Sequence, residues 1–329
     1  MTAGAHAPGE ASIDPEVSVI VVNWNGRRYL EACLRAVEGQ GDVRVEIVLV
    51  DNGSTDGTVD FVRSTFPRVR IVSLDENRGF AGGNNAGARE ARGELLAFLN
   101  NDTVPEPNWL AALRVGIDRE RGFALATSRI VYMHDPGVID SAGDGLFRAG
   151  AAFKWHHGER AETADASAEV FGVCGAACLM PKEVFEELGG FDADFFASHE
   201  DVDLSYRARL RGYRCRYVAA AVVRHHGSAT LGTISPFAVF HGQRNLEWMY
   251  LKNTPASRKG IKAGDHIVKI DHQSTDVLTS DEAVDRMRGT PSTPVTLWIA
   301  RKGEASLMRF DLTRALINVE SVQAKMLDK

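Results

Sequence analysis

The chain has 329 residues, of which 44% are hydrophobic and 25% are charged. This is the composition of an ordinary globular protein, so it excludes a chain that is disordered throughout. The formal net charge of −6 comes from 38 basic and 44 acidic residues and gives no reason to expect a nucleic-acid partner. The length predicts two domains. The longest apolar runs, such as residues 17–22, are far shorter than the about 20 residues that cross a bilayer, so we expect at most a peripheral membrane contact.

Residues 1–15 are predicted to form a flexible leader. They hold no basic start followed by an apolar run, so they are unlike a secretory signal, and we expect a cytoplasmic protein. The four cysteines are too few for a disulfide framework in a chain of this length. We therefore expect reduced, buried thiols, which agrees with that compartment.

Strands and helices are predicted to alternate over the first hundred residues. The order is strand 17–22, helix 27–37, strand 45–50, helix 58–65, strand 69–73, helix 81–92 and strand 95–99. Short connections between such elements predict an α/β fold with a mostly parallel sheet and helices on both faces. Ligands of these sheets bind beyond the carboxyl ends of the strands, where the polar loops 23–26, 51–57 and 100–103 fall.

The second half of the chain is less regular. Residues 123–168 are expected to contain only strands and loops. Later predictions are helix 181–189, helix 201–210, strand 213–223 and an amphipathic helix 237–251. The pattern then changes to strand 264–270, helix 280–288 and a hairpin of 294–301 with 306–312. A small second unit is therefore predicted to begin near residue 253.

Two of the polar loops contain candidate acidic ligands. Asp51 follows the second strand and can accept a hydrogen bond from a nucleobase NH; the alternative is a turn in which Asp56 caps the next helix. Asp102 follows the fourth strand and can bind a divalent cation that also holds phosphate oxygens. Its alternative is a helix-capping loop before Pro105.

Two further groups lie in the second half of the chain. Glu200 and Asp201 can supply a general base, or Ser198 and Asp201 can form a capping box at a helix start. His225 can complete a metal site begun by Asp102, or it can be a surface histidine.

All four groups occur in the order of one family pattern. The matching stretches are 18–26 (SVIVVNWNG), 50–58 (VDNGSTDGT), 77–87 (NRGFAGGNNAG), 99–103 (LNNDT), 175–178 (GAAC), 189–192 (GGFD) and 200–204 (EDVDL). Over residues 16–253 the chain resembles glycosyltransferase family 2, and most of all its bacterial rhamnosyltransferase-like members that build cell-envelope polysaccharides. The resemblance implies a GT-A fold, a Rossmann-like α/β domain that binds a nucleotide sugar.

The resemblance also implies roles for single residues. Those implied to bind the nucleotide sugar are Val22, Asn23, Asp51, Asn77, Gly79, Phe80, Asn84, Asn100 and Asn101. Where the family carries a DxD motif this chain has Asn in the first place, so the implied metal ligands are Asp102 and His225 together with the donor diphosphate. The implied cofactor is a divalent cation, Mg²⁺ or Mn²⁺.

Glu200 and Asp201 stand in the place of the family's acidic catalytic pair. The resemblance implies that Asp201 deprotonates an acceptor hydroxyl, which attacks the anomeric carbon and inverts its configuration. It favours dTDP-rhamnose as donor, with UDP- and GDP-sugars as alternatives. The implied acceptor is a cell-envelope glycan or a lipid-linked intermediate at the inner face of the plasma membrane. The rival hypothesis is a catalytically inactive nucleotide-binding domain fused to a peptide-binding module.

Residues 254–329 resemble part of a PDZ domain, similar to that of bacterial carboxy-terminal processing proteases. The matching stretches are 254–271, 280–289 and 295–301. The first strands of such a domain and its carboxylate-gripping loop are missing, as is the catalytic domain of the protease, so proteolysis is not expected. We interpret the join as a fusion to a small, incomplete α+β unit with an open sheet edge, with a natural two-domain enzyme as the alternative.

Overall fold

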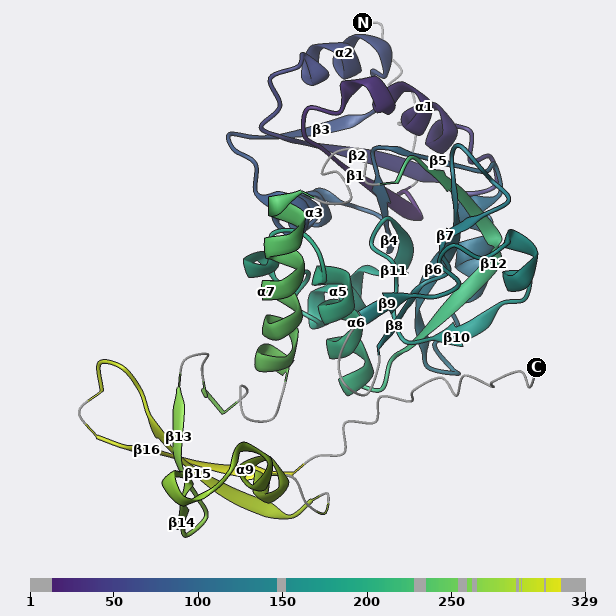
Figure 1. Cartoon of the computed structure of the whole chain (residues 1–329). Coiled ribbons are helices and arrows are strands. Elements are labelled where there is room, and N and C mark those ends of the chain that lie inside the picture. Colours follow the sequence, from purple (N-terminus) through teal and green to yellow (C-terminus); the bar gives the residue numbers. More distant parts are fainter. Residues whose placement is uncertain are drawn as a thin grey trace, which may run out of the picture.

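The structure is a computed structural model that describes residues 14–146, 152–227, 235–253, 259–261, 265–287, 290, 292–304 and 306–314. These residues form a ten-stranded sheet with helices on both faces, and a separate four-stranded sheet near the C-terminus (Figure 1). The expected α/β class is confirmed. Residues 1–13 of the predicted leader lie outside the described residues.

The first half of the large sheet is parallel and follows the predicted alternation. Strands β4, β1, β2 and β3 lie side by side in that order and all run in the same direction. The elements are β1 (Val17–Asn23), α1 (Arg27–Glu38), β2 (Val45–Asn52), α2 (Thr58–Thr65), β3 (Arg70–Leu74), α3 (Gly79–Glu90) and β4 (Leu95–Asn100).

Beyond β4 the sheet is mixed, in contrast to the mostly parallel order that was expected. Strand β11 lies between β4 and β6 and runs antiparallel to both, whereas β12 is parallel to β6. The elements up to β10 are β5 (Thr103–Pro105), α4 (Trp109–Gly116), β6 (Phe123–Tyr132), β7 (Ile139–Ser141), β8 (Asp144–Leu146), β9 (Ala152–Lys154), η1 (Ala161–Ala164) and β10 (Ala168–Val170). Those that follow are β11 (Ala177–Pro181), α5 (Lys182–Glu187), η2 (Ala193–Phe195), α6 (Glu200–Leu210), β12 (Arg214–His225) and α7 (Pro236–Asn253).

A hydrophobic core lies on each face of the sheet because successive side chains of a strand point in opposite directions. Val19 and Val21 of β1 pack in one core with α1, α2 and α4. Ile20 packs in the other core with α3, α5 and α6, together with Phe98. All four cysteines are buried and free, as expected.

Helix α4 supplies a buried tryptophan whose ring nitrogen needs a partner. Trp109 is fully buried, and its Nε1 donates a hydrogen bond of 2.8 Å to Ser128 Oγ on β6. Trp109→Phe removes this bond and part of the buried ring, so we expect the free energy of unfolding to fall by about 1–3 kcal/mol in urea titrations. Val115→Ala on the same helix, where the side chain is exposed, is the control. Equal unfolding free energies for wild type and Trp109→Phe would contradict this account of α4.

Glu169 ties the C-terminal end of α6 to the edge of the sheet. Its carboxylate accepts hydrogen bonds from Arg209 Nη1 (2.6 Å) and Arg214 Nε (2.9 Å). Burial alone would raise the pKa of Glu169, but these guanidinium groups lower it below its usual range. A lowered pKa means that the ionised carboxylate stabilises the folded state above the unfolded pKa, and that this contribution is lost as the pH falls through the folded pKa.

We therefore expect Glu169→Gln to be less stable than wild type at pH 7, on the order of 1 kcal/mol for this partly exposed group. The difference is expected to narrow as the pH falls below about 4. Thermal unfolding at a series of pH values measures it, with the exposed Glu120→Gln as control. A stability difference that stays constant from pH 7 to pH 3 would refute the assignment.

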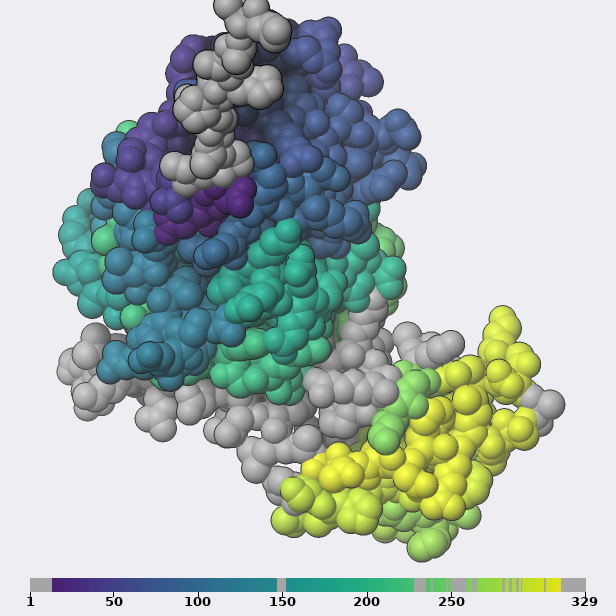
Figure 2. Space-filling model, turned by 180° about the vertical axis from the view of Figure 1, so that it is seen from behind, coloured from purple at the N-terminus to yellow at the C-terminus, as the bar shows by residue number. Residues whose placement is uncertain are grey.

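The C-terminal unit is a four-stranded sheet with strand order β14-β13-β15-β16. Its elements are β13 (His266–Ile270), β14 (Gln273–Ser274), η3 (Thr275–Val277), α9 (Ser280–Met287), β15 (Pro294–Ala300) and β16 (Met308–Thr313). The predicted hairpin is confirmed as β15 and β16, which pair antiparallel. Ile270, Leu297 and Ile299 form part of a small core. Figure 2 shows the C-terminal residues, in yellow, gathered in a lobe of their own.

In the part of the chain that the structure describes, no helix has the length and apolar character needed to span a membrane.

Candidate functional site

The carboxyl ends of β1, β2 and β4 lie at one edge of the sheet. Asn23 at the end of β1 is paired in register with Asp51 on β2, and Val22 is paired with Asn100 on β4. The side chains at the ends of these three parallel strands therefore face the same region, as expected for a ligand site in an α/β sheet.

Asn23 joins the loops that follow these strands. Its Nδ2 donates to Thr58 Oγ1 (2.9 Å), and its Oδ1 accepts from Asn101 Nδ2 (2.6 Å). The neighbouring Asp51 is 4% exposed, and among the described residues its Oδ1 has no hydrogen-bond partner. A buried carboxylate oxygen in that state is ready to accept a hydrogen bond from a ligand.

The segment from Asn77 to Asn84 is anchored to the end of β2. Asn52 Nδ2 donates to Asn77 Oδ1 (2.9 Å) and to Gly79 O (3.0 Å), while Asn84 Nδ2 donates to Phe80 O (3.0 Å). Gly79 has a φ of +70°, and a Cβ there would lie 2.3 Å from Phe196 O. Only glycine fits this position, because any side chain would collide with a backbone oxygen.

Two predicted apolar site residues lie beside this segment. Val22 is half-buried, and a Cβ on Gly83 would lie 2.7 Å from its Cγ1, so strand β1 and helix α3 approach closely here. Phe80 is also half-buried and packs edge-on against Phe191, with ring centroids 5.5 Å apart.

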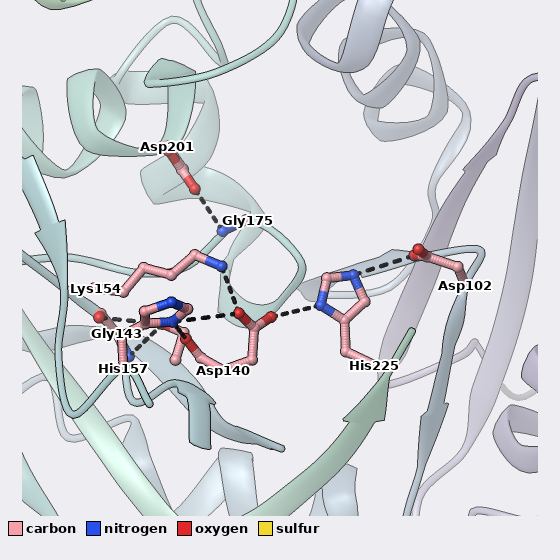
Figure 3. A network of polar contacts seen from close by, with 9 residues as sticks. Asp102, Asp140, Gly143, Lys154, His157, Gly175, Asp201 and His225 are labelled. Carbon is pink, nitrogen blue, oxygen red and sulfur yellow. Dashed lines mark hydrogen bonds and ion pairs between the residues drawn. The ribbon is translucent and has the colours of Figure 1, made fainter. Parts of the chain in front are cut away.

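Asp102, His225 and Asp140 form a chain of buried ionisable groups (Figure 3). His225 Nε2 lies 3.3 Å from Asp102 Oδ1, and His225 Nδ1 lies 2.7 Å from Asp140 Oδ2. Lys154 Nζ donates to the other oxygen of Asp140 (2.7 Å). The pairing of β5 with β12 sets Thr103 opposite His225, which brings Asp102 and His225 together. The alternative of a surface histidine is therefore wrong.

The charges of Asp102, His225 and Asp140 shift one another's pKa values. Burial alone would lower the pKa of His225, but Asp102 and Asp140 raise it to about 9. Burial would raise the pKa of Asp140, yet His225 and Lys154 hold it well below its usual range. The imidazole is therefore held as a cation between two carboxylates while no metal competes for Nε2.

The donor set of Asp102 and His225 suits a divalent cation. Asp102 offers a carboxylate oxygen, the ligand type that Mg²⁺ and Mn²⁺ prefer, and His225 offers an imidazole nitrogen, a common ligand of transition metals, 3.3 Å away. Asp140 on the far nitrogen matches the carboxylate that commonly orients a metal-binding histidine. The described residues contain no group of three or more His, Cys, Asp or Glu side chains placed to hold a metal, so ligand phosphates and water would have to complete the coordination.

Asp201 lies at the start of α6, beside the start of β11. Its Oδ2 accepts from Gly175 N and its Oδ1 from Val202 N, both at 2.8 Å. The residue after Gly175, Ala176, accepts a backbone hydrogen bond from Asn100 N (2.9 Å), so Asp201 stands close to the end of β4. The capping-box alternative is wrong, because α6 starts after His199 and no side chain caps it.

Glu200 is 5% exposed, and its Oε2 has no hydrogen-bond partner within the described ranges. Burial and the charge of Asp201 raise the pKa of Glu200 well above its usual value. Asp144 is also buried, and burial and the charge of Asp201 raise its pKa. Burial thus disfavours the charged forms of Glu200 and Asp144.

The backbone that leads into α6 is strained. Phe196, Ser198 and His199 have φ angles of +63°, +75° and +68°. Such angles cost of the order of 1–3 kcal/mol each in residues other than glycine, and they persist only where the surroundings enforce them.

The structure thus brings the predicted residues from β1, β2, β4, β12 and α6 to one edge of the sheet. Sequence reasoning missed Asp140, Asp144 and Lys154 of the same cluster. They come from the short strands β7, β8 and β9, and no periodicity marks these in the sequence.

Two family models match the chain. "Glycosyl transferase family 2" matches residues 18–189 and "PDZ domain" matches residues 250–300. The partial PDZ resemblance is thus confirmed.

Curated relatives share about 30% identity with the chain. The O-antigen biosynthesis protein RfbC of Myxococcus xanthus is 30% identical over 230 residues, which are 66% of this chain and 18% of that protein. The N-acetylglucosaminyl-diphospho-decaprenol L-rhamnosyltransferase of Mycobacterium tuberculosis (strain H37Rv) is 28% identical over 238 residues, 65% of this chain and 77% of that protein. The uncharacterized protein y4gI of Sinorhizobium fredii is 27% identical, and the chain spans only 25% of its length.

Solved structures show the same fold. GalNAc-T7 with UDP, GalNAc and Mn²⁺ superposes with a TM-score of 0.52 at 16% identity, over 91% of this chain and 68% of that one. Staphylococcus aureus TarS 1-349 in complex with UDP gives a TM-score of 0.50 at 18% identity, over 72% of this chain and 66% of that one. The expected GT-A fold is confirmed. The glycosyl transferase family 2 model covers more than half of the residues of this chain, so the chain belongs to that family.

Proposed function

We propose that this protein transfers a sugar from a nucleoside-diphosphate donor to a hydroxyl group of a glycan or lipid-linked acceptor. The observation that carries the proposal is the meeting of three acids at one edge of the sheet: Asp51 near the end of β2, Asp102 after β4, and Asp201 on α6 against the backbone just before β11. Each has chemistry suited to a different part of a nucleotide sugar.

The donor would bind along the ends of β1, β2 and β4. The unpartnered oxygen of Asp51 accepts a hydrogen bond from an NH group of the nucleobase. Asn23, which is paired with Asp51 in the sheet, contacts the base or the ribose. The Asn77–Asn84 segment covers the nucleotide. Asn100 and Asn101, which directly precede Asp102, lie beside the diphosphate. Amide and carboxylate groups of this kind recognise polar base and ribose edges by hydrogen bonding.

A divalent cation, Mg²⁺ or Mn²⁺, would be held by Asp102 and His225 with the diphosphate oxygens. When bound, it stabilises the negative charge that develops on the departing nucleoside diphosphate. The Mn²⁺ in the GalNAc-T7 structure supports a cation of this class. Asp140 orients the His225 ring for this role.

Asp201 would act as the general base. It takes the proton of the acceptor hydroxyl, whose oxygen then attacks the anomeric carbon from the face opposite the leaving diphosphate. The bond from the acceptor oxygen forms as the bond to the diphosphate breaks, so the configuration inverts and no covalent enzyme intermediate is needed. Burial and the charge of Asp201 raise the pKa of Glu200, which disfavours a second negative charge beside the base.

The mycobacterial N-acetylglucosaminyl-diphospho-decaprenol L-rhamnosyltransferase supports a rhamnosyl donor and a lipid-linked acceptor. We propose dTDP-rhamnose as this donor and the inner face of the plasma membrane as the place of transfer. UDP- and GDP-sugars are the competing donors. We propose that residues 16–253 form the transferase domain and residues 254–329 a separate PDZ-like unit, consistent with their separate sheets.

A donor screen tests the proposal. Thermal unfolding is measured with dTDP, UDP and GDP, each with and without Mn²⁺, because a ligand that binds the folded state raises its apparent stability. Mass spectrometry then follows release of the nucleoside diphosphate and sugar transfer to a polyprenyl-diphosphate-linked acceptor. We expect a shift with one nucleotide and turnover with its sugar. Nucleotide binding without turnover for any donor and acceptor would favour the inactive binding protein instead.

A further inference from the structure

Helix α7 presents one fully buried amide to the backbone that leads into α6. Asn245 is 0% exposed, and its Nδ2 lies within hydrogen-bond distance of three carbonyl oxygens. These are the backbone oxygens of Phe195 (2.8 Å), Ala197 (2.9 Å) and Ser198 (2.6 Å). An amide NH₂ has two hydrogens, so three acceptors share two donors, and all three contacts lie in one short turn.

The orientation of this amide is set by the residue before it. Arg244 Nε donates to Asn245 Oδ1 (2.9 Å), and a guanidinium group can only donate. The oxygen of the amide must therefore face Arg244, and the NH₂ must face the carbonyls. Arg244 Nη2 also donates to Asp194 O and Phe195 O, both at 3.1 Å. The guanidinium group lies over the Trp248 ring, 4.2 Å from its centroid.

The turn that Asn245 holds contains the strained residues Phe196 and Ser198 and ends at His199. The next residues are Glu200 and Asp201, so the path of this turn sets where Asp201 begins α6. The turn is also joined to α3, because Ala81 N donates to Phe196 O (3.1 Å). Residues with left-handed φ angles keep them only where contacts enforce the conformation, and the three hydrogen bonds from Asn245 are such contacts.

We propose that Asn245 is a positioning residue, which holds the strained turn 195–199 so that Asp201 points at the reacting hydroxyl. The proposal rests on the base role proposed for Asp201. Asn245 touches no substrate in this account and acts only through the backbone of the turn. The segment that covers the nucleotide has its own anchor in Asn52, so loss of Asn245 leaves donor binding largely intact.

The test compares Asn245→Ala and Asn245→Asp with Gln243→Ala, an exposed amide on the same helix, as control. Asn245→Asp keeps the shape and the contact with Arg244 but has no hydrogen to donate to the carbonyls. We expect kcat to fall about 10–100-fold in both Asn245 variants, since small misplacements of a catalytic group have effects of this size. The dissociation constant of the nucleotide is expected to change less than about threefold. A kcat equal to that of wild type would overturn the proposal.

A second substitution that restores activity distinguishes a positioning role of Asn245 from general damage to the fold. Glycine adopts a φ of +75° without strain, so adding Ser198→Gly to Asn245→Ala should recover several-fold of the lost kcat. If the double variant is no faster than Asn245→Ala, the strained turn is not what Asn245 supports, and the proposal fails.

Amide hydrogen exchange gives a readout that does not depend on turnover. Exchange over residues 195–203 should be at least about tenfold faster in both Asn245 variants than in wild type, and unchanged in Gln243→Ala. If amide exchange over residues 195–203 were unchanged in the Asn245 variants, Asn245 would not hold the turn, even if activity fell. A wild-type protein without transferase activity would instead contradict the proposed function, while the exchange data would still decide whether Asn245 holds the turn.

Discussion

Asp201→Asn is expected to lose most of its turnover, about 10²–10⁴-fold, while it still binds the nucleotide. The amide oxygen of Asn can accept the hydrogen bond from Gly175 N as the carboxylate does, and only the bond from Val202 N within the first turn of α6 is lost. An amide cannot take up a proton near neutral pH, and the acceptor hydroxyl then has no base. Release of nucleoside diphosphate under saturating donor and acceptor measures the loss.

The matched control is Asp60→Asn, the same chemical change at a side chain that is 93% exposed on α2. It should transfer sugar at the wild-type rate. Nucleotide binding by calorimetry should agree within about threefold among all three proteins. Transfer by Asp201→Asn at the wild-type rate would remove Asp201 from the role of base, and loss of nucleotide binding would mean that the substitution damaged the donor site.

Asp102→Ala is expected to abolish the metal dependence of donor binding. Asp102 is the one carboxylate that we assign to the cation, so its loss leaves His225 and the diphosphate as ligands. We expect donor affinity in Mn²⁺ to weaken at least about tenfold, to the value measured without metal. Calorimetric titrations with and without Mn²⁺ or Mg²⁺ give both affinities.

Asp42→Ala, at an exposed position before β2, serves as the control for loss of one negative charge. It should show the same difference between titrations with and without metal as the wild type. If Asp102→Ala also keeps this difference, Asp102 does not bind the cation.

The first half of the fold was predictable because β-branched runs such as residues 17–22 and 45–50 mark buried strands clearly. Strand direction was not predictable beyond β4. With helices on both faces, β11 and most of β6 are buried whichever way they run, so their sequences do not reveal that they pair antiparallel. No helix was predicted at α4, residues Trp109–Gly116.

The strand-end residues of the site were predictable for a physical reason. Asp51 and Asp102 directly follow hydrophobic strands, and the ends of parallel strands meet at one edge. Asp140 and Asn245 were not predictable in the same way. Asp140 lies in a three-residue strand without a pattern, and Asn245 looks like one more polar residue of an amphipathic helix until its contacts with the turn are seen.

The central claim is that Asp51, Asp102 and Asp201 serve one nucleotide-sugar site. A crystal structure of the protein with Mn²⁺ and the nucleoside diphosphate from the donor screen tests it most directly. We expect the base at Asp51, the cation on Asp102 and His225, and Asp201 facing the vacant sugar position. A nucleotide bound elsewhere would contradict the account, for example in the cavity of about 290 Å³ lined by Glu46 and Arg92 near the amino ends of the strands.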